Sequence, residues 1–253
     1  MRHVAKGICL RAWDYSETSQ ILALLTREFG VVRVIAKGIK RPKSKSGGMI
    51  DLLAEGDVVY SQKNVDSLGT LVEFRESISR AALRRHAKSL AAAVYAVELA
   101  GEMLADHDPH PEVYDLLSGT LRRLEDEESP AQAVLAWYQW RLLRFVGLLG
   151  GLTRCCACGE EVSQFASHDG VYFSSRLGGL LCDGCEGAEA EKSHVAPMTL
   201  SAIASLVANE QGRRSALSES QAGQLNRLLH YHITHQISKP LRSGRYVLPR
   251  GPV

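Results

Sequence analysis

The sequence of 253 residues lacks the features that mark membrane proteins and secreted proteins. No apolar run reaches the roughly 18 residues of a membrane span, because Glu98 and Glu102 interrupt the longest candidate at residues 90–104. The first residues hold no apolar segment followed by a small-residue cleavage site, so we expect a protein that is not secreted. A cytoplasmic protein without membrane contact is the resulting expectation.

Motifs of common enzyme classes are also missing. No G-x-x-x-x-G-K-[ST] phosphate loop is present, and the glycine-rich residues 147–152 follow a helical pattern, which excludes a dinucleotide fingerprint. The triplet His110-Pro111-Glu112 followed by Cys-x-x-Cys superficially resembles the zinc-deaminase signature. However, no proline precedes either cysteine pair, and the second pair would have no role. The residues therefore indicate neither a catalytic site nor a small-molecule substrate.

Charge is present in both signs but is unevenly distributed. Residues 1–80 carry 13 Lys and Arg against 9 Asp and Glu, residues 81–209 carry 10 against 17, and residues 210–253 carry 7 against 2. Two basic ends thus flank an acidic middle. A local basic patch attracts a polyanion more strongly than the net charge of +2 would suggest. Alternatively, the basic ends pair with the acidic middle inside the fold.

Residues 1–78 predict β structure, because short β-branched or alternating runs are separated by turn-rich breaks such as Phe29-Gly30. Five such strands fit a small closed or partly closed barrel, and an SH3-like barrel or a small sandwich would give a similar pattern. The expected strands are residues 3–13, 20–26, 31–36, 57–61 and 70–74.

From residue 79 the apolar period becomes helical. A third helix should begin with Ser129 as N-cap and Pro130 at the first helical position. The acidic run at residues 125–128 is most simply a solvated loop. The expected helices are residues 90–104, 113–124, 130–149, 200–208 and 221–237.

Five of the six cysteines lie between residues 155 and 185, and four of them form two Cys-x-x-Cys pairs. Cys155 pairs with Cys158 and Cys182 with Cys185, at the spacing of two zinc knuckles that complete a four-thiolate site. Disulfides are disfavoured in a reducing cytoplasm, and a redox Cys-x-x-Cys needs no second copy. We therefore predict a structural Zn²⁺ site, since four thiolates leave no open coordination position.

Four stretches of the sequence carry a resemblance to a known family: YSETSQILALLTREFGVVRVIAKGIKRPKSKSGG (residues 15–48), SLGTLVEF (67–74), CACG with GGLLCDGC, and LLHYHITHQISKPLRSGRYVL (228–248). The resemblance is to RecO, a family of bacterial recombination mediators. It covers nearly the whole chain in the right order. Cys156, an extra thiol, and Asp51, where a residue more like Gln is expected, depart from the family pattern.

The resemblance implies an α+β chain: an N-terminal OB-fold β-barrel followed by an all-α helical domain with an inserted four-cysteine zinc module. The expected parts are the barrel at residues 1–78, the helical domain at 79–152 and 191–253 with a basic C-terminal tail, and the zinc module at 153–190. It also implies a protein without a catalytic site that binds single- and double-stranded DNA and anneals complementary strands near the nucleoid. Its partners would be RecR, the C-terminal tail of single-stranded DNA-binding protein and, indirectly, RecA.

Phosphate contacts should dominate DNA binding, because aromatic residues make up only 6% of the chain. The barrel offers Trp13, Tyr15, Phe29, Tyr60 and Phe74 for stacking. The segment KGIKRPKSKSGG at residues 37–48 carries five cations and no acid, although it could also be a solvated linker. The candidate phosphate-binding residues are Arg27, Arg33, Lys37, Lys40, Arg41, Lys43 and Lys45 in the barrel, and Lys239, Arg242 and Arg245 in the tail.

A different class of function is an adaptor whose helical domain binds protein partners while DNA contact is minor. An acidic, apolar peptide would need an apolar groove edged by positive charge. Arg141 and Arg144 on the predicted third helix are the candidate residues for such a partner site.

Overall fold

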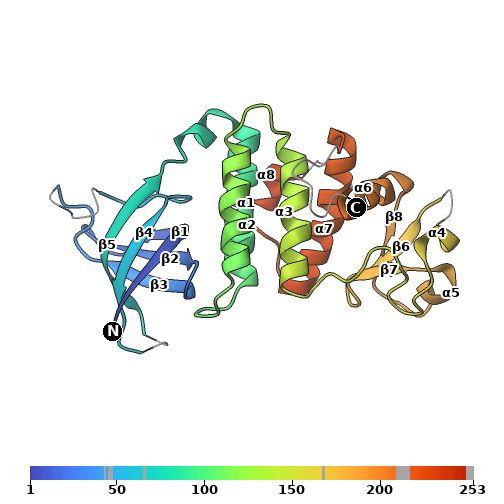
Figure 1. The fold of residues 1–253 in the computed structure, drawn as a ribbon, viewed down its shortest axis with the longest axis horizontal. Helices are drawn as coiled ribbons and strands as arrows, with labels where there is room; N and C mark the ends of the chain where they lie inside the picture. The colour runs from blue at the N-terminus through green and yellow to red at the C-terminus, as the bar shows by residue number, and fades with distance from the viewer. Residues whose placement is uncertain (43, 45–47, 65–66, 167–168, 209–216, 249–253) are drawn as a thin grey trace. The chain divides into compact units, whose positions relative to one another are not determined.

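The computed structural model describes residues 1–42, 44, 48–64, 67–166, 169–208 and 217–248 (Figure 1). The chain divides into two compact units, which are treated separately below: unit 1 (Met1–Glu127) and unit 2 (Glu128–Val253). Among the described residues, no helix has both the length and the apolar character that a membrane crossing requires.

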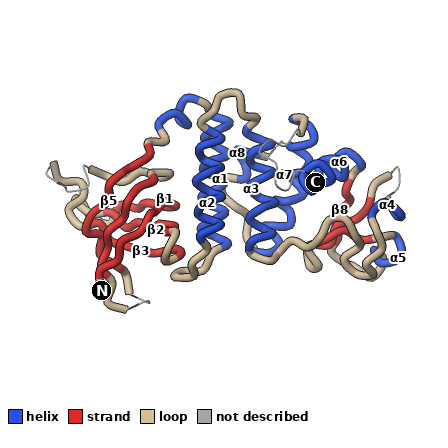
Figure 2. The backbone as a smooth tube through the Cα atoms, viewed as in Figure 1, coloured by secondary structure: helices blue, strands red, loops and turns tan. Residues whose placement is uncertain are grey.

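Unit 1 begins with five strands that form a closed barrel in the order β1-β2-β3-β5-β4 (Figure 2). Alternation directs Leu22, Leu24, Val32 and Val34 into the barrel, where they are fully buried. The predicted OB-type barrel is confirmed, and each strand equals its expected range or extends it. The strands are β1 (Arg2–Asp14), β2 (Gln20–Thr26), β3 (Gly30–Ala36), β4 (Glu55–Ser61) and β5 (Gly69–Ile78).

Two helices of unit 1 cover the outer face of the first strands. Leu25 alternates with the inward-facing residues of β2, so it points away from the barrel interior, yet it is fully buried. Leu10 of β1 lies against Gly101 of α1 and is also buried. Strand β2 is therefore covered on both faces. The helical elements are η1 (Ala81–Arg85), α1 (Ala87–Met103) and α2 (Pro111–Leu124).

A buried charge network holds these helices to the barrel. The Arg80 guanidinium, whose side chain is 4% exposed, bonds to the Glu55 carboxylate of β4 and, at 2.6 Å, to Glu125 after α2. Ser118 and Tyr114 of α2 also donate to Glu55, at 2.7 and 3.2 Å. The expectation of a solvated loop at residues 125–128 was therefore wrong for Glu125, which neutralises a buried cation.

Unit 2 contains a helical core in which α3 and α7 pack together. Inside this contact, the Gln139 amide donates to Asn226 Oδ1 at 2.6 Å, and both side chains are fully buried. Helix α3 is N-capped by Pro130, one residue after the predicted Ser129, and ends at Phe145, before the expected Leu149. The helices are α3 (Ala131–Phe145), α6 (Pro197–Ala208), α7 (Glu219–Ile237) and α8 (Gly244–Val247).

A small cysteine-bearing module lies between α3 and α6. It has a three-stranded antiparallel sheet in the order β7-β6-β8, which the sequence pattern did not predict because its strands have only three or four residues. Strand β8 lies beyond the expected module end at residue 190 but pairs with β6 inside it. The elements are α4 (Val162–Phe165), β6 (Val171–Ser174), β7 (Gly179–Leu181), α5 (Asp183–Glu186) and β8 (Lys192–Val195).

Candidate metal centre and nucleic-acid interface

The two Cys-x-x-Cys pairs come together in the module. One sulfur from each of Cys155, Cys158, Cys182 and Cys185 lies within 4.8 Å of all the others. Each pair occupies a tight turn: Gly159, with φ of +82°, donates its backbone N–H to the Cys155 carbonyl at 2.9 Å, and Cys185 N–H donates to the Cys182 carbonyl at 3.0 Å. The predicted four-cysteine module is therefore present.

The cluster fits a tetrahedral metal ion. Four sulfurs bound to zinc at about 2.3 Å would lie roughly 3.8 Å apart, and Cys158 Sγ lies 3.6 Å from Cys182 Sγ. Burial opposes ionisation of Cys155, but backbone N–H groups of Cys158 and Cys182 donate to its sulfur and lower its pKa to about 6. Burial instead raises the pKa of Cys182 to about 12. Four thiolates at this distance repel one another, so a bound cation is needed to ionise the whole set.

The remaining thiols do not join this cluster. Burial raises the pKa of Cys156 to about 11, and its side chain lies against Gly179, where a Cβ would be 2.8 Å from the Cys156 Cβ. Cys9 is fully buried inside the barrel, and burial raises its pKa to about 12. Neither thiol has the environment of a ligand or a nucleophile.

The basic segment leaves β3 beside the β1–β2 loop. Lys40 N–H donates to the Thr18 carbonyl at 3.1 Å, and Lys40 Nζ lies 2.8 Å from Asp14 Oδ1. Buried Ile39 fixes this start of the segment to the barrel core. Lys37 and Arg41 are exposed, and they have no ion-pair partner among the described residues. Lys43 and Lys45 lie outside those residues.

Two exposed aromatic side chains lie on the same side of the barrel as this segment. Trp13, at the end of β1, is 39% exposed, and Tyr15, in the following loop, is 62% exposed. By contrast, Tyr60 and Phe74 belong to the barrel core. Tyr15 is thus an open aromatic surface near Lys40, whose Nζ also donates to the Ser16 carbonyl at 3.3 Å. Trp13 is partly covered, since Arg11 Cζ lies 5.6 Å from the centroid of its ring.

The other two arginines predicted in the barrel are engaged by acids of unit 1. Arg27 donates to both Asp115 carboxylate oxygens at 3.0 Å, and Arg33 lies 2.8 Å from Asp106. Hydrogen bonding to Asp115 raises the pKa of Arg27, and the same contact lowers the pKa of Asp115. These pairs are well exposed, so phosphate could still compete for either arginine, and their predicted role stays a prediction.

The C-terminal cations lie on a packed segment. Leu241, Ser243 and Val247 are buried, and the Val247 carbonyl accepts a hydrogen bond from Gln132 at 2.8 Å. The charged side chains point outward from it, and Arg245 stacks on the Tyr246 ring at 4.7 Å. The exposed cations of this segment are Lys239, Arg242 and Arg245.

The two candidate partner-binding arginines stack on aromatic rings of their own helix. Arg141 Cζ lies 4.7 Å from the Phe145 ring centroid and 5.7 Å from that of Trp137. Arg144 Cζ lies 5.5 Å from the Trp140 ring centroid. Stacking orients each guanidinium along the helix surface. Their role in partner binding stays a prediction.

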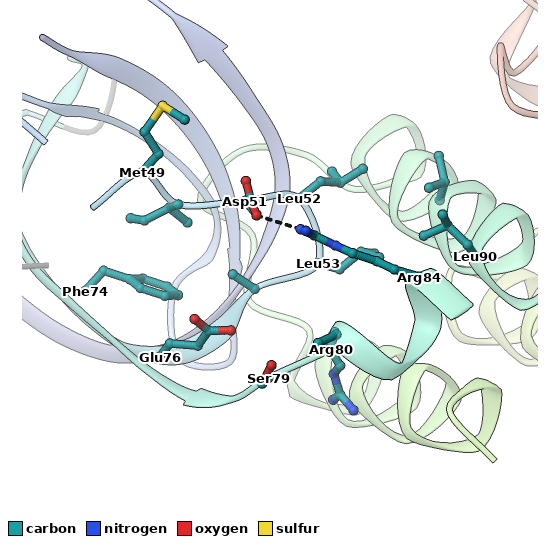
Figure 3. A pocket seen from close by; sticks show the side chains of 14 residues that line it. Met49, Asp51, Leu52, Leu53, Phe74, Glu76, Ser79, Arg80, Arg84 and Leu90 are labelled. Carbon is teal, nitrogen blue, oxygen red and sulfur yellow. Dashed lines mark hydrogen bonds and ion pairs between the residues drawn. The ribbon is translucent and has the colours of Figure 1, made fainter. Parts of the chain in front are cut away.

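Sequence reasoning missed two cavities in unit 1, because the residues that line each come from distant segments. One, of about 620 Å³, lies among residues 49–54, β5, η1 and α1, and the ion pair of Arg84 with Asp51 spans its edge at 2.6 Å (Figure 3). The second, of about 360 Å³, lies at the start of β3 and of the loop after β4. Only the second is lined by several aromatic rings.

Comparison with known proteins places both parts of the chain in one family. Residues 1–77 match the family model described as Recombination protein O N terminal, and residues 84–245 match Recombination protein O C terminal. A "DNA repair protein RecO" of Anaeromyxobacter dehalogenans (strain 2CP-C) is 33% identical, over 98% of this chain and 96% of the relative. The protein of the same name in Myxococcus xanthus is 29% identical, over 99% and 98%. That of Listeria innocua is 28% identical, over 75% and 71%.

Proposed function

This chain belongs to the RecO family of DNA repair proteins, and we propose that it binds single- and double-stranded DNA and anneals complementary strands. In this proposal it also helps to load RecA onto DNA covered by single-stranded DNA-binding protein. It acts as a non-enzymatic mediator in the cytoplasm, at the nucleoid. Its partners are RecR and the C-terminal tail of single-stranded DNA-binding protein.

One surface of the barrel carries this proposal. The segment with Lys37, Lys40 and Arg41 leaves β3 beside the end of β1, which carries Trp13, and the β1–β2 loop, which exposes Tyr15. OB folds bind oligonucleotides through the face of strands 2 and 3 and the loops at its edge. Here α1 and α2 cover the outer face of β1 and β2, whereas Tyr15, Lys37 and Arg41 in the loops are exposed. Cations there neutralise phosphates without reading sequence, which suits a protein that must leave bases free to pair.

Zinc is the metal that this donor set fits best. Four thiolates in two Cys-x-x-Cys turns form a closed site, so the ion would hold the module's fold and would not act on a substrate. Cys155, Cys158, Cys182 and Cys185 would be its ligands. In unit 2, Arg141 and Arg144 are proposed to receive an acidic protein tail.

The proposal is tested by replacing Lys37, Lys40 and Arg41 together with Ala and measuring DNA affinity from 50 to 300 mM salt. Each lost phosphate contact on single-stranded DNA lowers the slope of log affinity against log salt by about 0.7, so the slope should fall by roughly 2. A matched control replaces Arg2, Lys6 and Arg75, three exposed cations of β1 and β5, and removes the same charge.

The two variants separate the proposal from its rival. Loss of affinity for every DNA sequence in the first variant, with little change in the control, supports a phosphate-binding loop. Equal losses in both would show a general charge effect and count against the loop. Absence of any DNA binding by the unmodified chain at low salt would instead favour the adaptor function.

A further inference from the structure

The cavity of about 360 Å³ in unit 1 lies beside the shortest strand pairing of the closed barrel. Strands β3 and β5 pair only through Val34 and Ile35, opposite Gly69 and Thr70. Nearer the start of β3, the segment between α1 and α2 takes the place of a strand, since His107 N–H donates to the Val31 carbonyl at 2.9 Å. The cavity opens beside this junction, and its size is at the lower end of the range for small-ligand sites.

Three aromatic rings form the inner wall of the cavity. His3 of β1 stacks on Tyr60 of β4 with centroids 4.9 Å apart and an interplanar angle of 20°. Phe29, from the β2–β3 turn, meets His3 edge-on at 5.0 Å. Tyr60 is 1% exposed and belongs to the barrel core, whereas His3 and Phe29 are only half-buried. The outer two rings therefore present aromatic surface to the cavity.

Polar and positive groups form the rim. Lys63 and Asn64, both exposed, follow β4 at the mouth, and His107 lies opposite them. The Gln62 side-chain amide, which lies 3.3 Å from His107 Nε2, donates to the Ser67 carbonyl at 2.6 Å and so supports this edge. None of the described residues lining the cavity is acidic. The site thus combines aromatic faces, hydrogen-bonding groups and a cation.

We propose that this cavity binds one unpaired nucleobase of single-stranded DNA, an inference that rests on the proposed DNA binding. A base has a flat face that stacks on His3 and Phe29 and an edge that hydrogen-bonds with Asn64 or His107. Lys63 contacts the neighbouring phosphate. A base paired within a duplex cannot enter, because it would first have to leave the stack. The cavity therefore favours single strands over duplex, unlike the basic loop.

The test compares three fluorescent probes by anisotropy: oligodeoxythymidylate of 15 nucleotides, an abasic chain with the same number of phosphates, and a 15-base-pair duplex. The unmodified protein should bind the thymidylate about 10-fold more tightly than the abasic chain, because the abasic chain has no base to stack in the cavity. The double variant His3→Leu with Phe29→Leu keeps apolar packing but removes both rings. It should bind the thymidylate no more than about twofold more tightly than the abasic chain, while its affinities for the abasic chain and the duplex stay unchanged.

A second variant guards against a folding defect in the first. Asn64→Leu places an aliphatic side chain at the exposed rim, which removes a hydrogen-bonding group for the base edge and adds no ring on which a base could stack. The preference for the thymidylate over the abasic chain should therefore fall without a change in the barrel core. If the unmodified protein binds the thymidylate and abasic probes equally, the base site is refuted while DNA binding through phosphates stands. If it binds none of the three probes, the base site and the proposed function both fail.

Discussion

Both units bury polar side chains where their elements meet, but unit 1 buries charge between its barrel and helices, whereas the helical core of unit 2 buries neutral groups. In unit 1, Arg80 is enclosed between the carboxylates of Glu55 and Glu125. In the helical core of unit 2, the buried contacts include the amides of Gln139 and Asn226 and the imidazole of His232, whose Nε2–H donates to the Leu148 carbonyl at 2.8 Å. Removing one partner of a buried contact should therefore lower the free energy of unfolding more in unit 1. A fall in pH should lower the stability of unit 2 more.

The two β structures differ in a similar way. The barrel of unit 1 surrounds a continuous apolar core, so it can be stable without a ligand. The sheet of the cysteine module has three strands of only three or four residues. Such a small sheet buries too little apolar surface to be stable alone. The module's stability therefore depends on what its four sulfurs bind.

The largest effect should follow from Cys182→Ser, which removes one of the four sulfurs of the cluster. Structural zinc sites contribute about 10–16 kcal/mol to the folding of small zinc domains at neutral pH. The variant should lose the zinc that we propose for this cluster and become sensitive to protease within residues 153–195. Unit 1 should remain protected. Elemental analysis of the purified chain measures its zinc content, and limited proteolysis with mass spectrometry locates the cleaved segments.

Cys156→Ser is the matched control, because Cys156 follows Cys155 of the cluster in sequence but lies outside the cluster. It should retain one zinc ion per chain and normal protease resistance. Zinc loss in this variant as well would mean that Cys156 supplies a sulfur. A Cys182→Ser chain that stays protected would show that the module folds on packing alone.

The next largest effect is expected for Arg80→Met in unit 1. The substitution leaves Glu55 and Glu125 without their cation, and breaking a buried ion pair in this way costs about 3–5 kcal/mol. Hydrogen exchange should therefore accelerate across β4 and α2, measured by mass spectrometry of the corresponding peptides. Peptides of unit 2 provide the internal reference.

An exposed ion pair of the same unit serves as the control. Arg75 and Glu73 on β5 lie 3.1 Å apart with the Arg75 side chain 77% exposed, so Arg75→Met should cost less than about 1 kcal/mol. Equal effects of the two substitutions would contradict the view that buried charge holds the helices of unit 1 to its barrel.

Most elements could be predicted from local pattern, because alternation and helical period depend on near neighbours. The five barrel strands and the main helices fall within a few residues of their expected ranges. The module sheet could not be predicted, since strands such as β8 (Lys192–Val195) are too short to show a period. The N-cap of α3 was placed one residue early. Sequence reasoning put Ser129 at the N-cap and Pro130 at the first helical position, whereas Pro130 itself is the N-cap.

Functional residues could be predicted from the sequence where the residues that act together lie close to one another along the chain. Spacing alone identified the four cysteines, because each knuckle needs two sulfurs three residues apart. Arg27 was proposed as a phosphate ligand, but the chain pairs it with Asp115, 88 residues away, which no local pattern reveals. The aromatic cavity was missed for the same reason: His3, Phe29, Tyr60 and His107 meet only in the folded barrel.

The smallest expected effect is a loss of stability of unit 2 at low pH, caused by protonation of His232. It tests whether the buried polar contacts in the helical core of unit 2 must stay neutral. Burial lowers the pKa of His232 below its usual 6.5, and His235 nearby adds to this, although the Leu148 carbonyl opposes it. Its Nδ1 is buried without a hydrogen-bond partner among the described residues, so a proton added there would have no acceptor. The ring packs edge-on against Phe173 of the module at 5.2 Å. Protonation should therefore loosen the contact between α7 and the module.

The sign follows from which state binds the proton. Because the folded pKa is depressed, the unfolded chain takes up the proton first, so this contribution to stability is complete above about pH 6.5 and is lost as the pH falls below it. Urea denaturation is followed by tryptophan fluorescence in a Trp13→Phe background. The signal then comes from unit 2 alone, since the remaining tryptophans, Trp137 and Trp140, lie in α3. The urea midpoint should fall between pH 7 and pH 5, and His232→Gln, which stays neutral, should remove much of that fall. An unchanged pH response in His232→Gln would assign it to another group, which a His235→Gln variant would identify by losing the response instead.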